Sequence, residues 1–103
     1  MRIVKVRYAR RASRDILSIM SFIAQHGNPQ TAIDVATRIF VACDMLGQFP
    51  KLGHLGPVKQ TRESVVPGLP YIVVHRLREQ EAEVIVLAIR HGAENRGAAT
   101  YDP

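Results

Sequence analysis

Three short strand-like runs between residues 61 and 93 constrain the fold more than any other part of this 103-residue chain. The runs cover residues 61–66, 69–77 and 84–89, and turn-forming residues such as Pro67-Gly68 separate them. Short runs rich in β-branched and aromatic residues between turn signals are typical of consecutive antiparallel strands. The last two runs are almost continuously apolar, which predicts that both faces of these strands are covered.

Two amphipathic helices are predicted before this block. Ser13 is the expected N-cap of the first helix, Asp15 lies in its expected first turn, and Gly27 is a suitable end. Asn28-Pro29 then starts a second helix, which is expected to end at Gly47. Because the break between them is so short, the two helices should form an antiparallel hairpin. The core stripe of the second helix comprises Ala32, Val35, Ala36, Ile39, Ala42, Cys43 and Leu46.

The remaining segments complete an α+β order of strand, helical hairpin and three antiparallel strands. Residues 2–8 alternate apolar and basic side chains, which indicates a half-buried edge strand. Two prolines and two glycines in residues 49–57 predict a loop, in which Phe49 and Leu52 should close the end of the core. The hairpin is expected on one sheet face, within a single domain over residues 1–103. Residues 94–103 show no periodicity and are expected to form a flexible tail.

Charge is the most distinctive part of the composition. The formal net charge is +5, and six of the cations precede the first acidic residue, Asp15. Such a field favours nucleic acid or an acidic protein segment as partner, although a solvated basic edge is an equally simple interpretation. One cysteine cannot form an internal disulfide, and no apolar run is long enough for a signal peptide or membrane span. These features predict a cytoplasmic protein.

Motifs for metals, cofactors and covalent catalysis are not found. The histidines His26, His54, His75 and His91 do not cluster at ligand spacing, and Cys43 lies on an apolar helical stripe, as structural cysteines usually do. The glycines of residues 49–57 lead into a proline and lack a P-loop lysine. No metal and no cofactor are therefore expected.

Basic and titratable residues lie near the ends of the three predicted strands: Arg62, Arg76, Arg90 and His91, with Glu63 nearby. A metal-free ribonuclease needs a general base, a general acid and cations that stabilise the phosphorane. His91 or Glu63 could act as the base, and the three arginines could hold the phosphate.

A simpler interpretation of this rim is that its arginines pair with Glu79, Glu81 and Glu83 as an ordinary solvated sheet edge. His75 lies inside an apolar run, so we interpret it as a core histidine and not as a catalyst.

An ordered series of short motifs resembles the RelE/ParE superfamily of bacterial toxins, and its ParE branch most closely. The motifs are Phe49-Pro50-x-x-Gly53, Thr61-Arg62-Glu63, Val66-x-Gly68-x-Pro70-Tyr71, an apolar strand ending in Arg76, and Ile89-Arg90-His91-Gly92-Ala93. The resemblance covers nearly the whole chain and implies the same order of strand, helical hairpin and sheet.

The resemblance implies a toxin of a type II toxin–antitoxin or plasmid-stabilisation module, neutralised by a small ParD-like antitoxin. ParE-like toxins are described as inhibitors of DNA gyrase, and RelE-like members as ribosome-dependent mRNA interferases. Gly92 stands where some interferases carry a tyrosine, which favours gyrase inhibition by binding. The alternatives are a RelE-like nuclease using Arg62, Arg76, Arg90 and His91, and an inactive homologue that only forms complexes. The candidate residues for toxicity are Arg62, Arg76, Arg90, His91 and Arg96.

Overall fold

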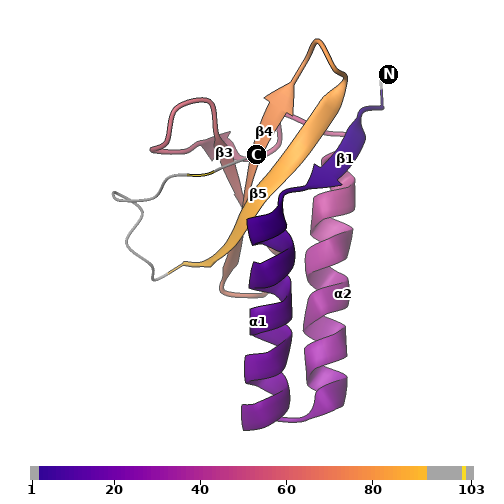
Figure 1. The fold of residues 1–103 in the computed structure, drawn as a ribbon, viewed down its shortest axis with the longest axis vertical. Helices are drawn as coiled ribbons and strands as arrows, with labels where there is room; N and C mark the ends of the chain where they lie inside the picture. The colour runs from indigo at the N-terminus through magenta and orange to yellow at the C-terminus, as the bar shows by residue number, and fades with distance from the viewer. Residues whose placement is uncertain (1–2, 93–100, 102–103) are drawn as a thin grey trace.

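The computed structural model describes residues 3–92 and Tyr101, and in this part of the chain two helices cover one face of a five-stranded sheet (Figure 1). The elements in chain order are β1 (Lys5–Tyr8), α1 (Arg10–His26), α2 (Pro29–Met45), β2 (His54–Leu55), β3 (Arg62–Val65), β4 (Tyr71–Arg78) and β5 (Glu83–His91). The predicted α+β fold, the helical hairpin and the antiparallel β3–β4–β5 block are confirmed.

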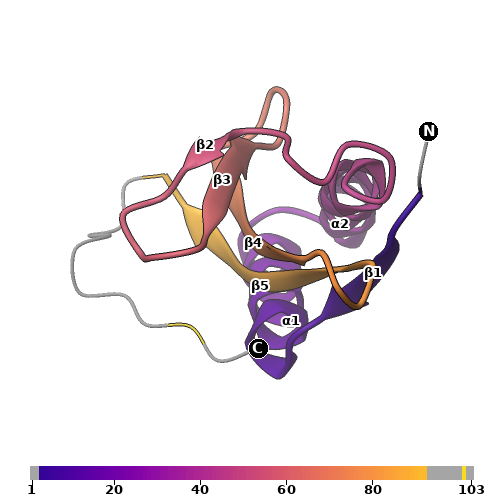
Figure 2. The same cartoon turned by 90° about the horizontal axis from the view of Figure 1, so that it is seen from above.

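The sheet has the order β1-β5-β4-β3-β2, seen from above in Figure 2. The expected edge strand β1 runs parallel to the long strand β5, and all other pairs are antiparallel. The sequence prediction lacked β2, because it assigned residues 49–57 to a loop without any element. This was wrong: Gly53 adopts a positive φ of 86°, and the two residues after it pair with β3.

The helix boundaries follow local capping chemistry. Asn28 accepts a hydrogen bond from the Thr31 amide at 2.8 Å, and the proline after it occupies the first helical position, as predicted. The predicted start of the first helix at Ser13 was wrong, because α1 follows β1 directly with Ala9 as N-cap. The carboxylate of Asp15 instead accepts a hydrogen bond from the Ile89 amide at 2.9 Å. This bond lies beyond the last β1–β5 pair and fixes α1 against β5.

Hydrophobic clusters cover both faces of the central strands, as the continuous apolar runs predicted. The larger cluster fills the space between the helices and the sheet and includes Ile16, Ile39 and Leu46. A smaller cluster on residues such as Ile85 and Leu87 also contains Tyr101. All residues from 84 to 90 are buried in consequence.

The expected plug at the end of the core does not form. Phe49 and Leu52 are 44% and 43% exposed, because the segment after α2 passes along the surface toward β2. The prediction of a flexible tail over residues 94–103 concerns a segment of which only Tyr101 lies within the described residues, where it is buried.

Candidate functional site

Two of the predicted site residues, Arg62 and Arg76, line one cavity of about 680 Å³, here called the charged cavity. β3 begins at Arg62, opposite His75, whereas β4 continues to Arg78. The chain turns away just before β3, since Gln60 has a positive φ of 64°. A notch therefore remains beside the end of β4. Its lining residues are Lys51, Leu55, Gln60, Arg62, Arg76, Leu77, Arg78, Glu79, Gln80 and Glu81.

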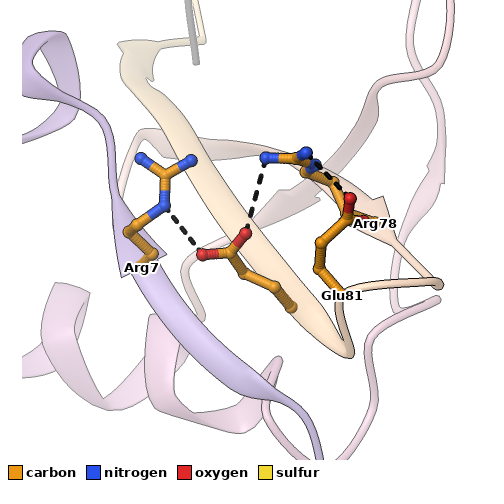
Figure 3. Close-up of polar contacts among 4 residues, drawn as sticks. Arg7, Arg78 and Glu81 are labelled. Carbon is orange, nitrogen blue, oxygen red and sulfur yellow. Dashed lines mark hydrogen bonds and ion pairs between the residues drawn. The ribbon is translucent and has the colours of Figure 1, made fainter.

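Ion pairs neutralise half of the cations around the charged cavity. The Lys51 Nζ lies 3.7 Å from a carboxylate oxygen of Glu79. Arg78 contacts Glu81 at 3.0 Å and Glu83 at 3.7 Å, as part of the chain of ion pairs in Figure 3. The other carboxylate oxygen of Glu83 accepts a hydrogen bond from Arg7 at 2.8 Å, which joins β1 to β5.

Arg62 and Arg76 differ from these two cations, because neither has a carboxylate partner within the described residues. The Nε atoms of both are buried and make no hydrogen bond there. The nearest polar contact of Arg62 is a long one, 3.4 Å, to the Gly53 carbonyl oxygen. The interpretation that Arg62 and Arg76 pair with the glutamates of the β4–β5 turn was therefore wrong.

Arg90 does not lie on an accessible rim, which corrects its assignment as a phosphate-binding or target-binding residue. Its side chain is 0% exposed and its Nη2 lies 3.8 Å from the carboxylate of Glu63, which is 1% exposed. Arg90 points from β5 to the sheet face opposite the helices, where Ile72 of β4 lies between it and β3. Glu63 is equally unsuited to act as a general base, because it is the buried counterion of Arg90.

His91 lies at the other end of the β4–β5 pair from the charged cavity. Its ring packs edge-to-face on Tyr71, with ring centroids 5.9 Å apart, and the residue is exposed. Tyr71 precedes Arg76 by five residues along β4, which corresponds to roughly 17 Å of extended chain. A general base must approach its proton to about 3 Å, so one phosphate cannot contact both His91 and Arg76. Arg96, the remaining candidate, lies outside the described residues.

The histidine and cysteine predicted to be structural are buried. His75 is 0% exposed and its Nε2 lies 2.9 Å from the Pro50 carbonyl oxygen. Burial lowers the pKa of His75, and the nearby Arg62 charge acts in the same direction. Burial raises the pKa of the Cys43 thiol to about 12, so this thiol stays protonated and unreactive at neutral pH.

Sequence reasoning did not identify an apolar groove of about 580 Å³ between α2 and the β2–β3 segment. Val41 and Met45 form its helical wall, and Leu52 and Val65 face them from the other side. All four side chains are at least 41% exposed. The sequence signal that could have indicated this groove was the i, i+4 pair Val41 and Met45, which are apolar but lie outside the core stripe of α2. Arg38, Ala42, Gly53, His54, Glu63, Ser64, Val66 and Pro67 complete the lining.

Two further observations concern metal binding and membrane spanning by the described residues. Among them, no group of three or more histidine, cysteine, aspartate or glutamate side chains is arranged to hold a metal ion. Neither helix of this part of the chain is long and apolar enough to cross a membrane.

Comparison with known proteins gives consistent relationships. The family model described as the ParE toxin of the type II toxin–antitoxin system parDE matches residues 6–96. A Sinorhizobium fredii (strain NBRC 101917 / NGR234) protein named "Putative toxin Y4kP" is 33% identical over 87 residues, which are 84% of this chain and 86% of that protein.

Two solved structures have similar folds. A chain of the chromosomal ParDE toxin–antitoxin system of P. aeruginosa superposes with a TM-score of 0.79 at 19% identity, covering 86% of this chain and 96% of that one. A chain of the RelBE2 toxin–antitoxin complex of Mycobacterium tuberculosis gives 0.62 at 18% identity, covering 91% and 97%. The family model spans most of the chain, and the sequence relative exceeds 30% identity over most of both proteins. The chain therefore belongs to the ParE toxin family of type II toxin–antitoxin systems, within the RelE/ParE superfamily.

Proposed function

We propose that this protein is a toxin that inhibits DNA gyrase by binding to it, without cleaving nucleic acid itself. The observation that carries the proposal is the separation of the residues that a metal-free nuclease would need. Arg62 and Arg76 line the charged cavity, His91 lies at the opposite end of the strands, and Arg90 is buried against Glu63. The half-buried Arg62 and Arg76 and the exposed His91 offer a basic surface for a macromolecule, but His91, the base predicted from the sequence, is not next to the phosphate site that the two arginines could form.

The test uses purified toxin separated from any antitoxin. Gyrase supercoiling of relaxed plasmid should fall as toxin is added, and a defined RNA incubated with ribosomes and the same toxin should stay intact. RNA incubated with His91→Ala should also stay intact, because the wild-type toxin is expected to have no cleavage activity that the substitution could remove. RNA degradation by the wild type that disappears in His91→Ala would refute the proposal.

The apolar groove supports a second part of the proposal, namely neutralisation by a small ParD-like antitoxin. Four exposed apolar side chains around a groove of about 580 Å³ are costly to leave in water, and an amphipathic segment would cover them. The net charge of +5 favours a partner with acidic residues around its apolar face. The ParDE and RelBE2 relatives come from toxin–antitoxin systems, which agrees with such a partner.

This part is tested by co-expression with the small acidic protein expected from a neighbouring reading frame. Met45→Lys should weaken the complex more than about tenfold, because it places a charge inside the apolar contact. Leu17→Lys on α1 is the matched control, since Leu17 is 66% exposed and does not line the groove. Equal affinity of the two variants would exclude the groove as the antitoxin site.

A RelE-like nuclease remains the second candidate, and the charged cavity is the observation that favours it. Arg62 and Arg76 could hold a phosphate there, while Glu79 or Glu81 would have to supply the acid and base. In that case Arg76→Ala should reduce ribosome-dependent RNA cleavage while the fold is retained. Soluble expression with no effect on growth, gyrase or RNA would identify an inactive homologue.

A further inference from the structure

We infer that two copies of this chain associate through the end of the helical hairpin, here called the hairpin tip and defined as residues 19–33. The first basis is that the sheet does not cover this end: both helices extend beyond it in Figure 1. In the core stripe of α1, Ala12 and Ile16 are buried, whereas Ile19 and Ile23 further along the helix are only half-buried. The hairpin tip therefore exposes apolar surface of the kind that the sheet covers nearer the start of α1.

Two exposed apolar side chains mark the hairpin tip, one on each helix. Phe22 of α1 is 61% exposed, and Ile33 of α2 is 51% exposed. Each lies five residues from the connection Gly27-Asn28, which corresponds to about 7.5 Å along a helix. The two side chains therefore lie at the same level of the hairpin. Protein–protein interfaces are enriched in aromatic side chains of this kind.

The ring of Phe22 is held in place before any contact forms. It stacks on the ring of His26, with ring centroids 4.3 Å apart. The Nδ1 atom of His26 lies 2.9 Å from the Phe22 carbonyl oxygen, one turn back along α1. A side chain that is already fixed loses less conformational entropy on association. The stacked pair is thus suited to be the rigid centre of an interface.

The lack of charge at the hairpin tip indicates which partner it fits. All 14 basic and all 9 acidic residues of the chain lie outside residues 16–33. A two-fold contact brings the same surface of two copies together, so most surfaces of a protein with a net charge of +5 would repel their own copy. The uncharged hairpin tip avoids this repulsion. It also offers no lysine or arginine to an acidic protein segment or to a phosphate backbone.

This contact is separate from the surfaces used in the proposed function. Neither the apolar groove nor the charged cavity has a lining residue from the hairpin tip. Self-association can therefore be measured without gyrase, nucleic acid or antitoxin. Failure of the proposed function would leave the contact between copies untouched, and the absence of a dimer would leave the proposed function untouched.

The experiment is sedimentation velocity of the purified toxin without antitoxin, over about 1 µM to about 500 µM, a range suited to a contact smaller than a standard interface. The wild type should change reversibly from monomer to dimer as its concentration rises. Phe22→Lys should raise the dimer dissociation constant by at least about tenfold, because each contact then contains two ammonium groups that must lose water.

Ile33→Lys is a second variant with the same expectation. Positions 22 and 33 are both exposed, so the substitutions should leave the fold intact, which circular dichroism checks. Leu55→Lys is the matched control, because it adds the same charge at a 72% exposed leucine of β2, outside the hairpin tip. It should change the dissociation constant less than about twofold, as expected for a distant charge at physiological salt.

Concentration-dependent chemical shifts of the ¹⁵N-labelled toxin locate the contact, and they should be largest at the amides of residues 19–33. A monomer at every concentration would overturn the inference, and so would an equal loss of dimer in Phe22→Lys and Leu55→Lys. Weaker antitoxin binding by Phe22→Lys, together with a monomeric wild type, would overturn it as well and assign the hairpin tip to the antitoxin.

Discussion

Replacing Arg90 should destabilise the fold, because the structure makes this residue the buried counterion of Glu63. Both side chains are at most 1% exposed, and their charged atoms lie 3.8 Å apart. Removing one partner of a buried ion pair leaves a desolvated charge and costs about 3–5 kcal/mol. A domain of this size has a total stability of about 5–15 kcal/mol. Arg90→Met should therefore lower the midpoint of urea unfolding by about 2 M at a typical m-value near 2 kcal/mol/M.

The double variant Glu63→Gln/Arg90→Met separates this explanation from a simple packing defect. It removes the buried carboxylate that has lost its arginine, so it should be more stable than the single Arg90→Met variant by at least about 1 kcal/mol. Within the part of the chain that the structure describes, the three guanidinium nitrogens of Arg90 have no hydrogen-bond partner, which further limits what the native pair contributes. An Arg90→Met protein with an unchanged urea midpoint and lost toxicity would refute this reasoning and return Arg90 to the target-binding surface.

Three further variants test the local structure that holds the site. Gly53→Ala should lower the free energy of unfolding by more than about 2 kcal/mol in thermal unfolding, because φ is +86° and an added Cβ would lie 2.2 Å from the Glu63 carbonyl oxygen. Gly92→Ala is the control and should be nearly neutral, since the nearest atom to its added Cβ lies at 3.6 Å. The pKa of His75 is lower in the folded state, so the unfolded chain binds more protons below about pH 6.5 and stability should fall from pH 7 to pH 5.5. His75→Gln should flatten that dependence in urea titrations at each pH. Asn28→Ala should cost about 1 kcal/mol through loss of its cap, with Asn28→Ser close to wild type by calorimetry.

The fold was predictable from the sequence because each main element carries a local signal. Asn28-Pro29 specifies the break between the helices, and the continuous apolar runs specify two strands buried on both faces. The failures occurred where a distant partner decides the structure. Asp15 looked like a first-turn residue of a helix, but its partner is the amide of Ile89, 74 residues away. β2 exists because Gly53 lets the chain turn onto β3, which a count of prolines and glycines cannot indicate.

The site residues were less predictable, because sequence position does not show which end or face of a strand a side chain occupies. Arg90 and His91 are adjacent in sequence, yet one is buried against Glu63 and the other is exposed beside Tyr71. Arg76 and Arg62 line one cavity because β3 begins only at Arg62, and the turn at Gln60 before β3 sets that start. The charged cavity thus depends on where strands stop, and that is the least certain part of a strand prediction.

The apolar groove and the charged cavity share the β2–β3 segment as a common wall. His54 pairs with Glu63 on the apolar groove, and Leu55 pairs with Arg62 on the charged cavity. A partner chain that fills the groove and then continues past this segment would reach the charged cavity. Its sequence would need an amphipathic part followed or preceded by an extended acidic part. If one antitoxin occupies both surfaces, each contact raises the effective concentration for the other, so affinity losses at the two surfaces should not simply add.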